Sequence, residues 1–244
     1  MKLVSLLVLT FLSFNVKAQN ISLKDYSFNM TDIRSRGHSK ESLYSSMNKD
    51  MIKLSSSICS NRALIWVNDF KRFQNIDAGK IFLFYTGKTG RAGRKTWWYH
   101  VAPVVSESGQ PWVLDPGFPA VINTPLNIAD WLVEFAGTSN CREIRAGENE
   151  LIEKMFSEQV FPEFTQAYGR QDCYYHIAPA GLWTPGTVAN HLLGVDETGT
   201  PVPHVGTEID QYQVLDACKE AISSSIGRMF GGQEKKCKKY LGIY

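Results

Sequence analysis

Three residues have the types and the order of a catalytic triad built on a cysteine: Cys59, then His100, then Asp115. An ordinary thiol is mostly protonated at neutral pH, but a helix N-terminus and a nearby imidazolium can lower its pKa to about 3.5–7.5. A carboxylate on the far side of the imidazole would orient the ring and stabilise its charged form. This set of residues predicts nucleophilic catalysis by a thiolate.

The segment that must carry the nucleophile is ICSNRALIWVNDFKRF, residues 58–73. Its apolar residues recur at spacings of three and four, which predicts a helix with one buried face. The serines at 55–57 can cap that helix, because their hydroxyls accept its unpaired first-turn amide hydrogens. Cys59 then lies in the first turn, where amide hydrogens and the helix dipole favour an anion.

Three strands are expected next, over residues 80–86, 96–105 and 111–116. The first is apolar on both faces, as a central strand is, and the second alternates so that His100 shares a side with Trp98 and Ala102. Asp115 ends the third strand, directly before Pro116. If these strands are antiparallel neighbours, the imidazole and the carboxylate lie side by side. A cysteine helix followed by these strands is the order of papain-like and transglutaminase-like folds.

A second histidine has nearly the same surroundings, since WWYHVAP at 97–103 is echoed by CYYHIAP at 173–179. No strand ending in Asp-Pro follows His176, so we expect it to be a packing or hydrogen-bonding residue beside a disulfide. Metal ligation by Cys173, His176, His191 and His204 is the alternative, but their spacing matches no compact zinc motif. We therefore expect no metal and no cofactor. The alternative for His100 is a hydrogen-bonded core histidine.

The first twenty residues, MKLVSLLVLTFLSFNVKAQN, have the pattern of a secretory signal with a small-residue cleavage site. We expect cleavage after Ala18 and a secreted or periplasmic protein. Removal of Lys2 and Lys17 leaves 24 basic against 24 acidic side chains, a balance that argues against nucleic acid or an anionic membrane as partner. A hydrophobic content of 43% is enough for a substantial core.

Five cysteines in an exported chain predict two disulfides and one free thiol. With Cys59 set aside as the nucleophile, nearest neighbours give Cys141–Cys173 and Cys218–Cys237. Four cysteines allow three pairings, and the sequence does not choose among them.

The remaining pattern predicts helices over 40–54, from Thr124-Pro125 to Phe135, over 148–160 and over 212–230. We expect an α+β fold in which the nucleophile helix packs on an antiparallel sheet, with a helical, disulfide-stabilised C-terminal part. The predicted organisation is a signal peptide at 1–18 and a polar arm or short pro-segment at 19–39. A catalytic core at 40–160 and a C-terminal extension at 161–244, packed on the core, complete it.

Three motifs in this order resemble the bacterial protein-glutamine glutaminases, whose fold is related to the transglutaminase core. They are Cys59-Ser60-Asn61-Arg62-Ala63, Trp97-Trp98-Tyr99-His100-Val101-Ala102 and Asp115-Pro116. The resemblance covers residues 50–120. It implies a Cys59/His100/Asp115 triad that converts glutamine side chains of proteins or peptides to glutamate through a thioester, with release of ammonia.

Several points stay open at this level. The same triad would serve a transglutaminase or a cysteine peptidase, and a disulfide-stabilised binding module or toxin with a vestigial triad is the non-enzyme alternative. Trp97, Trp98 and Tyr99 could wall the substrate site or be ordinary strand packing. We expect a monomer that binds proteins with exposed glutamine, and neither nucleic acid nor, after signal cleavage, a membrane.

Overall fold

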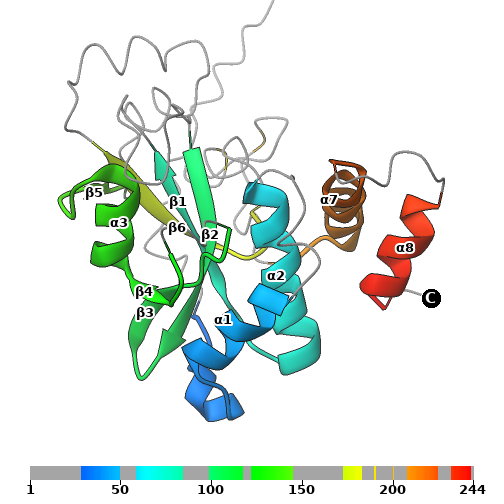
Figure 1. Cartoon of the computed structure of the whole chain (residues 1–244), viewed down its shortest axis with the longest axis horizontal. Helices are drawn as coiled ribbons and strands as arrows, with labels where there is room; N and C mark the ends of the chain where they lie inside the picture. Colours follow the sequence, from blue (N-terminus) through cyan, green and yellow to red (C-terminus); the bar gives the residue numbers. More distant parts are fainter. Residues whose placement is uncertain are drawn as a thin grey trace, which may run out of the picture.

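The computed structural model describes residues 29–49, 59–84, 99–117, 122–144, 173–182, 190, 200, 208–224 and 232–242. Within them the fold is mixed α+β: a sheet with helices packed around it (Figure 1). The signal peptide, the polar arm up to residue 28, Trp97, Trp98 and the helix predicted over 148–160 lie outside the described residues.

Helix α2, Cys59–Gln74, is the predicted nucleophile helix. Its apolar face is buried as expected, with Ala63, Trp66, Val67 and Phe70 all at most 3% exposed. Because residues three and four apart share a helix face, this burial fixes the rotation of α2 against the sheet. The rotation in turn fixes the direction in which the first turn, with Cys59, presents its side chains.

The sheet is built around β1, Gly79–Phe84, which is buried along its whole length. Its neighbours are β2, Tyr99–Glu107, and β6, Tyr174–Pro179, and the full strand order is β4-β3-β2-β1-β6-β5. Among the described strands, four of the five pairings are antiparallel, and the short β5, Arg142–Glu143, runs parallel to β6. The predicted antiparallel order of the first three strands is confirmed, whereas the place of β6 beside β1 was not anticipated.

Strand β3, Gln110–Val113, is shorter than predicted. A tight turn joins it to β2, with Ser108 and Gly109 both at positive φ, 54° and 77°. The chain leaves the ladder after Val113, and the last bond at this edge is donated by the Leu114 amide to the Pro103 carbonyl at 2.9 Å. Asp115 therefore lies just beyond the strand and not within it.

Helix α3, Ile128–Ala136, begins three residues later than the Thr124-Pro125 start that we predicted. Leu126 and Asn127 instead form the short strand β4, which pairs with β3. Asn127 is the true N-cap, since its side-chain oxygen accepts the Asp130 amide at 2.9 Å. Strand pairing outcompeted the local Thr-Pro signal, which explains the error.

Helix α1, Lys40–Lys49, starts where predicted and buries Leu43 and Met47. Ser39 and Ser42 cap it reciprocally, because each hydroxyl accepts the backbone amide of the other, at 3.2 and 3.1 Å. The remaining predicted residues, 50–54, lie outside the described part of the chain.

Helices α7, Gln211–Ser224, and α8, Gln233–Tyr240, lie beside α2 on the side away from α3 (Figure 1). Disulfide Cys218–Cys237 joins the two helices, and Cys141–Cys173 joins the start of β5 to the start of β6. These are the predicted pairs. Helix α7 was predicted over 212–230, of which 225–230 is not described; α8 was not predicted, since its basic, weakly apolar sequence gives little helical period.

Polar contacts attach these C-terminal helices along the nucleophile helix. The Asn61 side-chain amide donates from Nδ2 to Glu220 Oε2 at 2.6 Å, and Gln211 Nε2 donates to Asn68 Oδ1 at 3.0 Å. Further along, Tyr240 donates its hydroxyl to Asp69 at 3.0 Å. Helix α2 is thus held by the sheet on one side and by α7 and α8 on the other.

Within the described residues, no helix is long and apolar enough to cross a bilayer, and no group of three His, Cys, Asp or Glu side chains is arranged to hold a metal ion. The alternative metal set also loses a ligand, because Cys173 is bonded to Cys141. Its members His191 and His204 lie outside the described residues.

Candidate active site

Cys59 is the first residue of α2 and the free cysteine of the chain, since the other four form the two disulfides. The residue is partly exposed. The first-turn amides of a helix have no partners within the helix and carry a partial positive charge. This position favours a thiolate, as the sequence predicted.

His100 is the second residue of β2 and only 1% exposed. Its Nε2–H donates to Asp115 Oδ2 across 2.7 Å. With that nitrogen engaged by the carboxylate, Nδ1 is the ring nitrogen left to exchange a proton with the thiol. The structure therefore brings together the histidine and the aspartate that strand order predicted, and their catalytic role stays a prediction.

The electrostatics of Cys59 favour the ionised form. Burial raises the pKa of the thiol, but hydrogen bonding from His100, the charge of that ring, the Val101 backbone amide and the charge of Arg62 together bring the pKa below its ordinary value. These effects favour the thiolate, which is the nucleophilic form of cysteine.

The pKa of His100 is shifted in the opposite direction, upward. Burial lowers the pKa of His100, but the Asp115 carboxylate and the Cys59 sulfur outweigh it and raise the pKa to about 9. Asp115 itself stays ionised, because the opposing effect of burial on its pKa is outweighed by His100, by Trp131 and by the charge of Arg62. The directions of these three pKa shifts favour a thiolate–imidazolium–carboxylate chain.

Asp115 is nearly fully buried and receives two hydrogen bonds on one oxygen. Besides His100, the Trp131 indole N–H donates to Oδ2 at 3.1 Å. Trp131 and Phe135, one turn apart on α3, also stack on the His100 ring, with centroids 5.8 and 4.5 Å away. Sequence reasoning missed both aromatic residues, because nothing in their spacing distinguishes them from ordinary core residues of an amphipathic helix.

The Arg62 guanidinium lies against the backbone of Gly117, two residues after Asp115. A methyl group built on Gly117 would lie 3.2 Å from the Arg62 guanidinium and 3.4 Å from Asp115 Oδ1. The guanidinium and the carboxylate thus both approach the bare backbone of Gly117. The charge of Arg62 lowers the pKa of both Cys59 and Asp115. The Cys-x-x-Arg spacing was the signal in the sequence.

The other predicted site residues differ in their position relative to Cys59. Tyr99 precedes His100, is partly exposed and donates its hydroxyl to Ser60 Oγ at 3.5 Å, next to the nucleophile. Trp97 and Trp98 lie outside the described residues. His176 lies on β6, with its Nδ1 3.3 Å from the Ile144 carbonyl oxygen. It follows disulfide-bonded Cys173 closely and is not joined to the Cys59 group.

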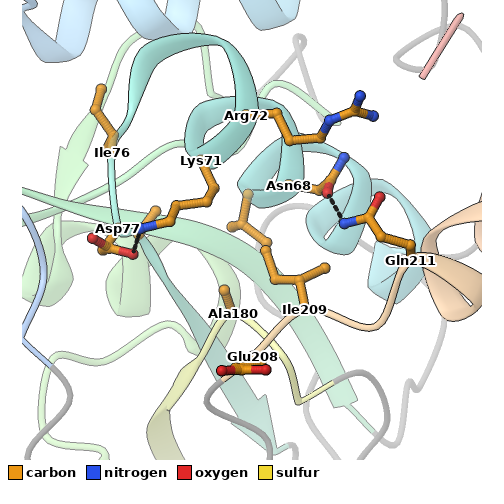
Figure 2. A pocket seen from close by; sticks show the side chains of 11 residues that line it. Asn68, Lys71, Arg72, Ile76, Asp77, Ala180, Glu208, Ile209 and Gln211 are labelled. Carbon is orange, nitrogen blue, oxygen red and sulfur yellow. Dashed lines mark hydrogen bonds and ion pairs between the residues drawn. The ribbon is translucent and has the colours of Figure 1, made fainter. Parts of the chain in front are cut away.

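A cavity of about 380 Å³ lies at the C-terminal half of α2 (Figure 2). Asn68 and Gln211 are hydrogen-bonded at its edge, and Lys71 reaches Asp77 at 2.6 Å. None of Cys59, His100 and Asp115 lines it. The cavity is therefore separate from the candidate site.

Comparison with known proteins agrees with the motifs. Residues 39–135 match a protein-family model described as Glutaminase, in agreement with the family that the motifs resemble, and the match supports a hydrolase that acts on amide groups. The chain is also similar to a solved structure, "The NMR structure of protein-glutaminase from Chryseobacterium proteolyticum". That similarity has 12% identity and a TM-score of 0.42, and it covers 81% of this chain and 89% of the other. No curated protein sequence matches the chain.

Proposed function

We propose, from the glutaminase-family match of residues 39–135, that this chain is a secreted protein-glutamine glutaminase. It would convert glutamine side chains of proteins or peptides to glutamate. The observation that carries the proposal is the His100–Asp115 contact of 2.7 Å, with the partly exposed Cys59 thiol interacting with the same imidazole. The two disulfides fit an oxidising compartment and support the secretion part of the proposal.

The first chemical step is attack by the Cys59 sulfur on the carboxamide carbon of a glutamine side chain. A new C–S bond forms, and the carbonyl oxygen takes up the negative charge. The Cys59 backbone amide, at the start of α2, is the donor that we assign to this oxyanion. Such preorganised donors act strongly because they do not need to reorient as the charge develops.

Collapse of this intermediate breaks the C–N bond. The His100 imidazolium donates its Nδ1 proton to the departing nitrogen, which leaves as ammonia, and a thioester remains on Cys59. Asp115 stabilises the imidazolium through Nε2–H and does not itself take the proton.

Water completes the reaction. Neutral His100 accepts a proton from the water as its oxygen attacks the thioester carbon, and the C–S bond then breaks. The products are a glutamate side chain, the Cys59 thiolate and the recharged imidazolium. The core that supports this chemistry would be papain- or transglutaminase-like, with a nucleophile helix against an antiparallel sheet and a C-terminal extension packed upon it.

The test is ammonia release from a glutamine-containing protein, measured with and without a primary amine. We expect ammonia release by the wild type, no incorporation of the amine, and loss of release in Cys59→Ala and Cys59→Ser. Amine incorporation would identify a transglutaminase instead, and new N-termini would identify a peptidase. A wild-type protein with none of these activities would contradict the enzymatic proposal and favour a binding module or toxin.

A further inference from the structure

Trp131 contacts the candidate triad at the carboxylate. Its side chain is completely buried, and its indole N–H points at Asp115 Oδ2 from 3.1 Å. The same oxygen accepts the His100 Nε2–H at 2.7 Å. Two donors from different elements, β2 and α3, therefore meet on one carboxylate oxygen.

The geometry of α3 makes this contact rigid. Trp131 and Phe135 are four residues apart, so they lie on the same helix face, and their ring centroids are 5.1 Å apart. Both rings also stack on the imidazole of His100, at interplanar angles of 26° and 23°. The Asn127 cap fixes where the helix begins and hence which face carries these rings.

We propose that Trp131 is a positioning residue of the triad, which locks the Asp115 carboxylate toward His100 by donating its indole N–H to the oxygen that the imidazole uses. This inference rests on the proposed function for its catalytic meaning. Trp131 acts on the triad through its hydrogen bond to Asp115 and through the stacking of its ring on His100.

The physical reason lies in the freedom of a buried carboxylate. With a single hydrogen bond, the Asp115 side chain can rotate about its last torsion angle and move its charge off the imidazole. A second donor fixes the plane of the carboxylate and helps to offset its desolvation. A firmly placed carboxylate stabilises the imidazolium, and the imidazolium in turn stabilises the Cys59 thiolate.

Four groups on or next to the neighbouring elements interact electrostatically with this chain of residues. They are Arg62 on α2, Tyr99 on β2, Asp115 after β3 and Tyr44 on α1. Burial raises the pKa of Tyr44 to about 12 and also raises that of Tyr99, so neither hydroxyl titrates near neutral pH. A change in the pH profile of Cys59 is thus read as a change in the His100–Asp115 pair.

The variant that tests the proposal is Trp131→Phe, which keeps an aromatic ring and removes the N–H. The readout is the rate of Cys59 alkylation by iodoacetamide against pH, which needs no substrate. We expect the midpoint of the rise in rate to move upward by roughly 0.5–1 pH unit, because one hydrogen bond to a charged group is lost. We also expect kcat for ammonia release to fall roughly tenfold.

Trp66→Phe is the matched control, because Trp66 is also buried but lies on α2 outside the triad. It should lower stability without moving the alkylation midpoint. An unchanged midpoint in Trp131→Phe, or an equal shift in Trp66→Phe, would overturn the inference. If Trp131→Phe does not fold, 3-benzothienylalanine at position 131 replaces only the N–H by sulfur, and the same two outcomes apply.

The two proposals can fail separately. A shifted midpoint in a protein that releases no ammonia would uphold the role of Trp131 in holding the ion pair and refute the glutaminase function. Ammonia release with an unshifted midpoint would refute the role of Trp131 alone.

Discussion

Strands β2 and β6 carry nearly the same five residues, YHVAP and YHIAP, and flank the same central strand. In the described structure, His100 of β2 meets the Asp115 carboxylate, whereas His176 of β6 meets the backbone carbonyl of Ile144. Both strands run antiparallel to β1 and pair with its two opposite edges. His100 pairs with Leu83, and Leu83 pairs in turn with Tyr175. His176 pairs with Phe82 instead, one residue along.

This offset of one residue in register decides the surroundings of the two imidazole rings. Successive residues of a strand point to opposite faces, so His100 and His176 lie on opposite sides of the sheet. On the first side, α3 and the chain after β3 supply Trp131, Phe135 and Asp115. On the second, His176 meets the backbone carbonyl of Ile144. Local sequence makes both strands, and register decides which histidine lies beside Asp115.

The largest expected effect breaks this comparison directly. His100→Gln should lower kcat/KM for ammonia release at least about 100-fold, because general acid–base catalysis contributes that much or more. His176→Gln should change it by no more than about twofold, as expected for a substitution outside the site. Steady-state kinetics of the two purified variants, with circular dichroism to confirm folding, makes the measurement. Equal losses in both would show that the faces are not functionally distinct.

A buried lysine on the His176 side of the sheet provides a second test of this comparison. Lys80 on β1 is completely buried on the His176 side, two residues from Phe82, and within the described residues its Nζ has no hydrogen-bond partner. Lys80→Met should raise the free energy of unfolding by about 1–3 kcal/mol, because it removes an unsatisfied buried polar group. Urea denaturation gives the value. Destabilisation would instead reveal a stabilising contact of this amine.

The same substitution has a signed pH dependence. Burial lowers the pKa of Lys80 well below its ordinary value, so the unfolded chain binds a proton there that the folded protein does not. Wild-type stability at this residue therefore increases as pH rises toward 10.5, and the gain in Lys80→Met should shrink over that range. The alkylation profile of Cys59 should not move, since Lys80 faces away from His100.

The smallest expected effect is a fall in kcat/KM at alkaline pH that depends on His100 and not on His176. Because the pKa of His100 is raised to about 9, the imidazolium that protonates the departing nitrogen persists up to that pH and is lost above it. kcat/KM should then fall about tenfold per pH unit beyond 9. Asp115→Asn should move the limb to lower pH, and His176→Gln should leave it in place. A limb near 6.5 in the wild type would contradict a carboxylate-stabilised imidazole.

The helices and strands differ in how well their bounds could be predicted from the sequence. Helix α2 and strands β1 and β2 were predictable because each has an unbroken apolar period of its own length. The end of β3 and the start of α3 were placed wrongly, since β3–β4 pairing overrides the Thr124-Pro125 signal. Strand β6 was unrecognised, because its pairing with β1 joins segments that are far apart in the chain.

The candidate site shows the same division. Cys59, His100 and Asp115 could be named from residue type and order, since few arrangements give a nucleophile, a base and an orienting carboxylate in that sequence. Trp131 could not be named, because an indole that donates to a carboxylate looks in the sequence like any other core residue of α3. The close approach of Arg62 to Gly117 was hidden for a similar reason.

By itself, the sequence determined the candidate reactive groups, the helix that begins at the cysteine and the strand on which His100 lies, because residue chemistry and apolar periodicity are local properties. Only the tertiary structure decided which histidine faces Asp115 and what holds that carboxylate. Those outcomes depend on strand register and on packing between distant segments, and a shift of one residue in register would exchange the two faces of the sheet.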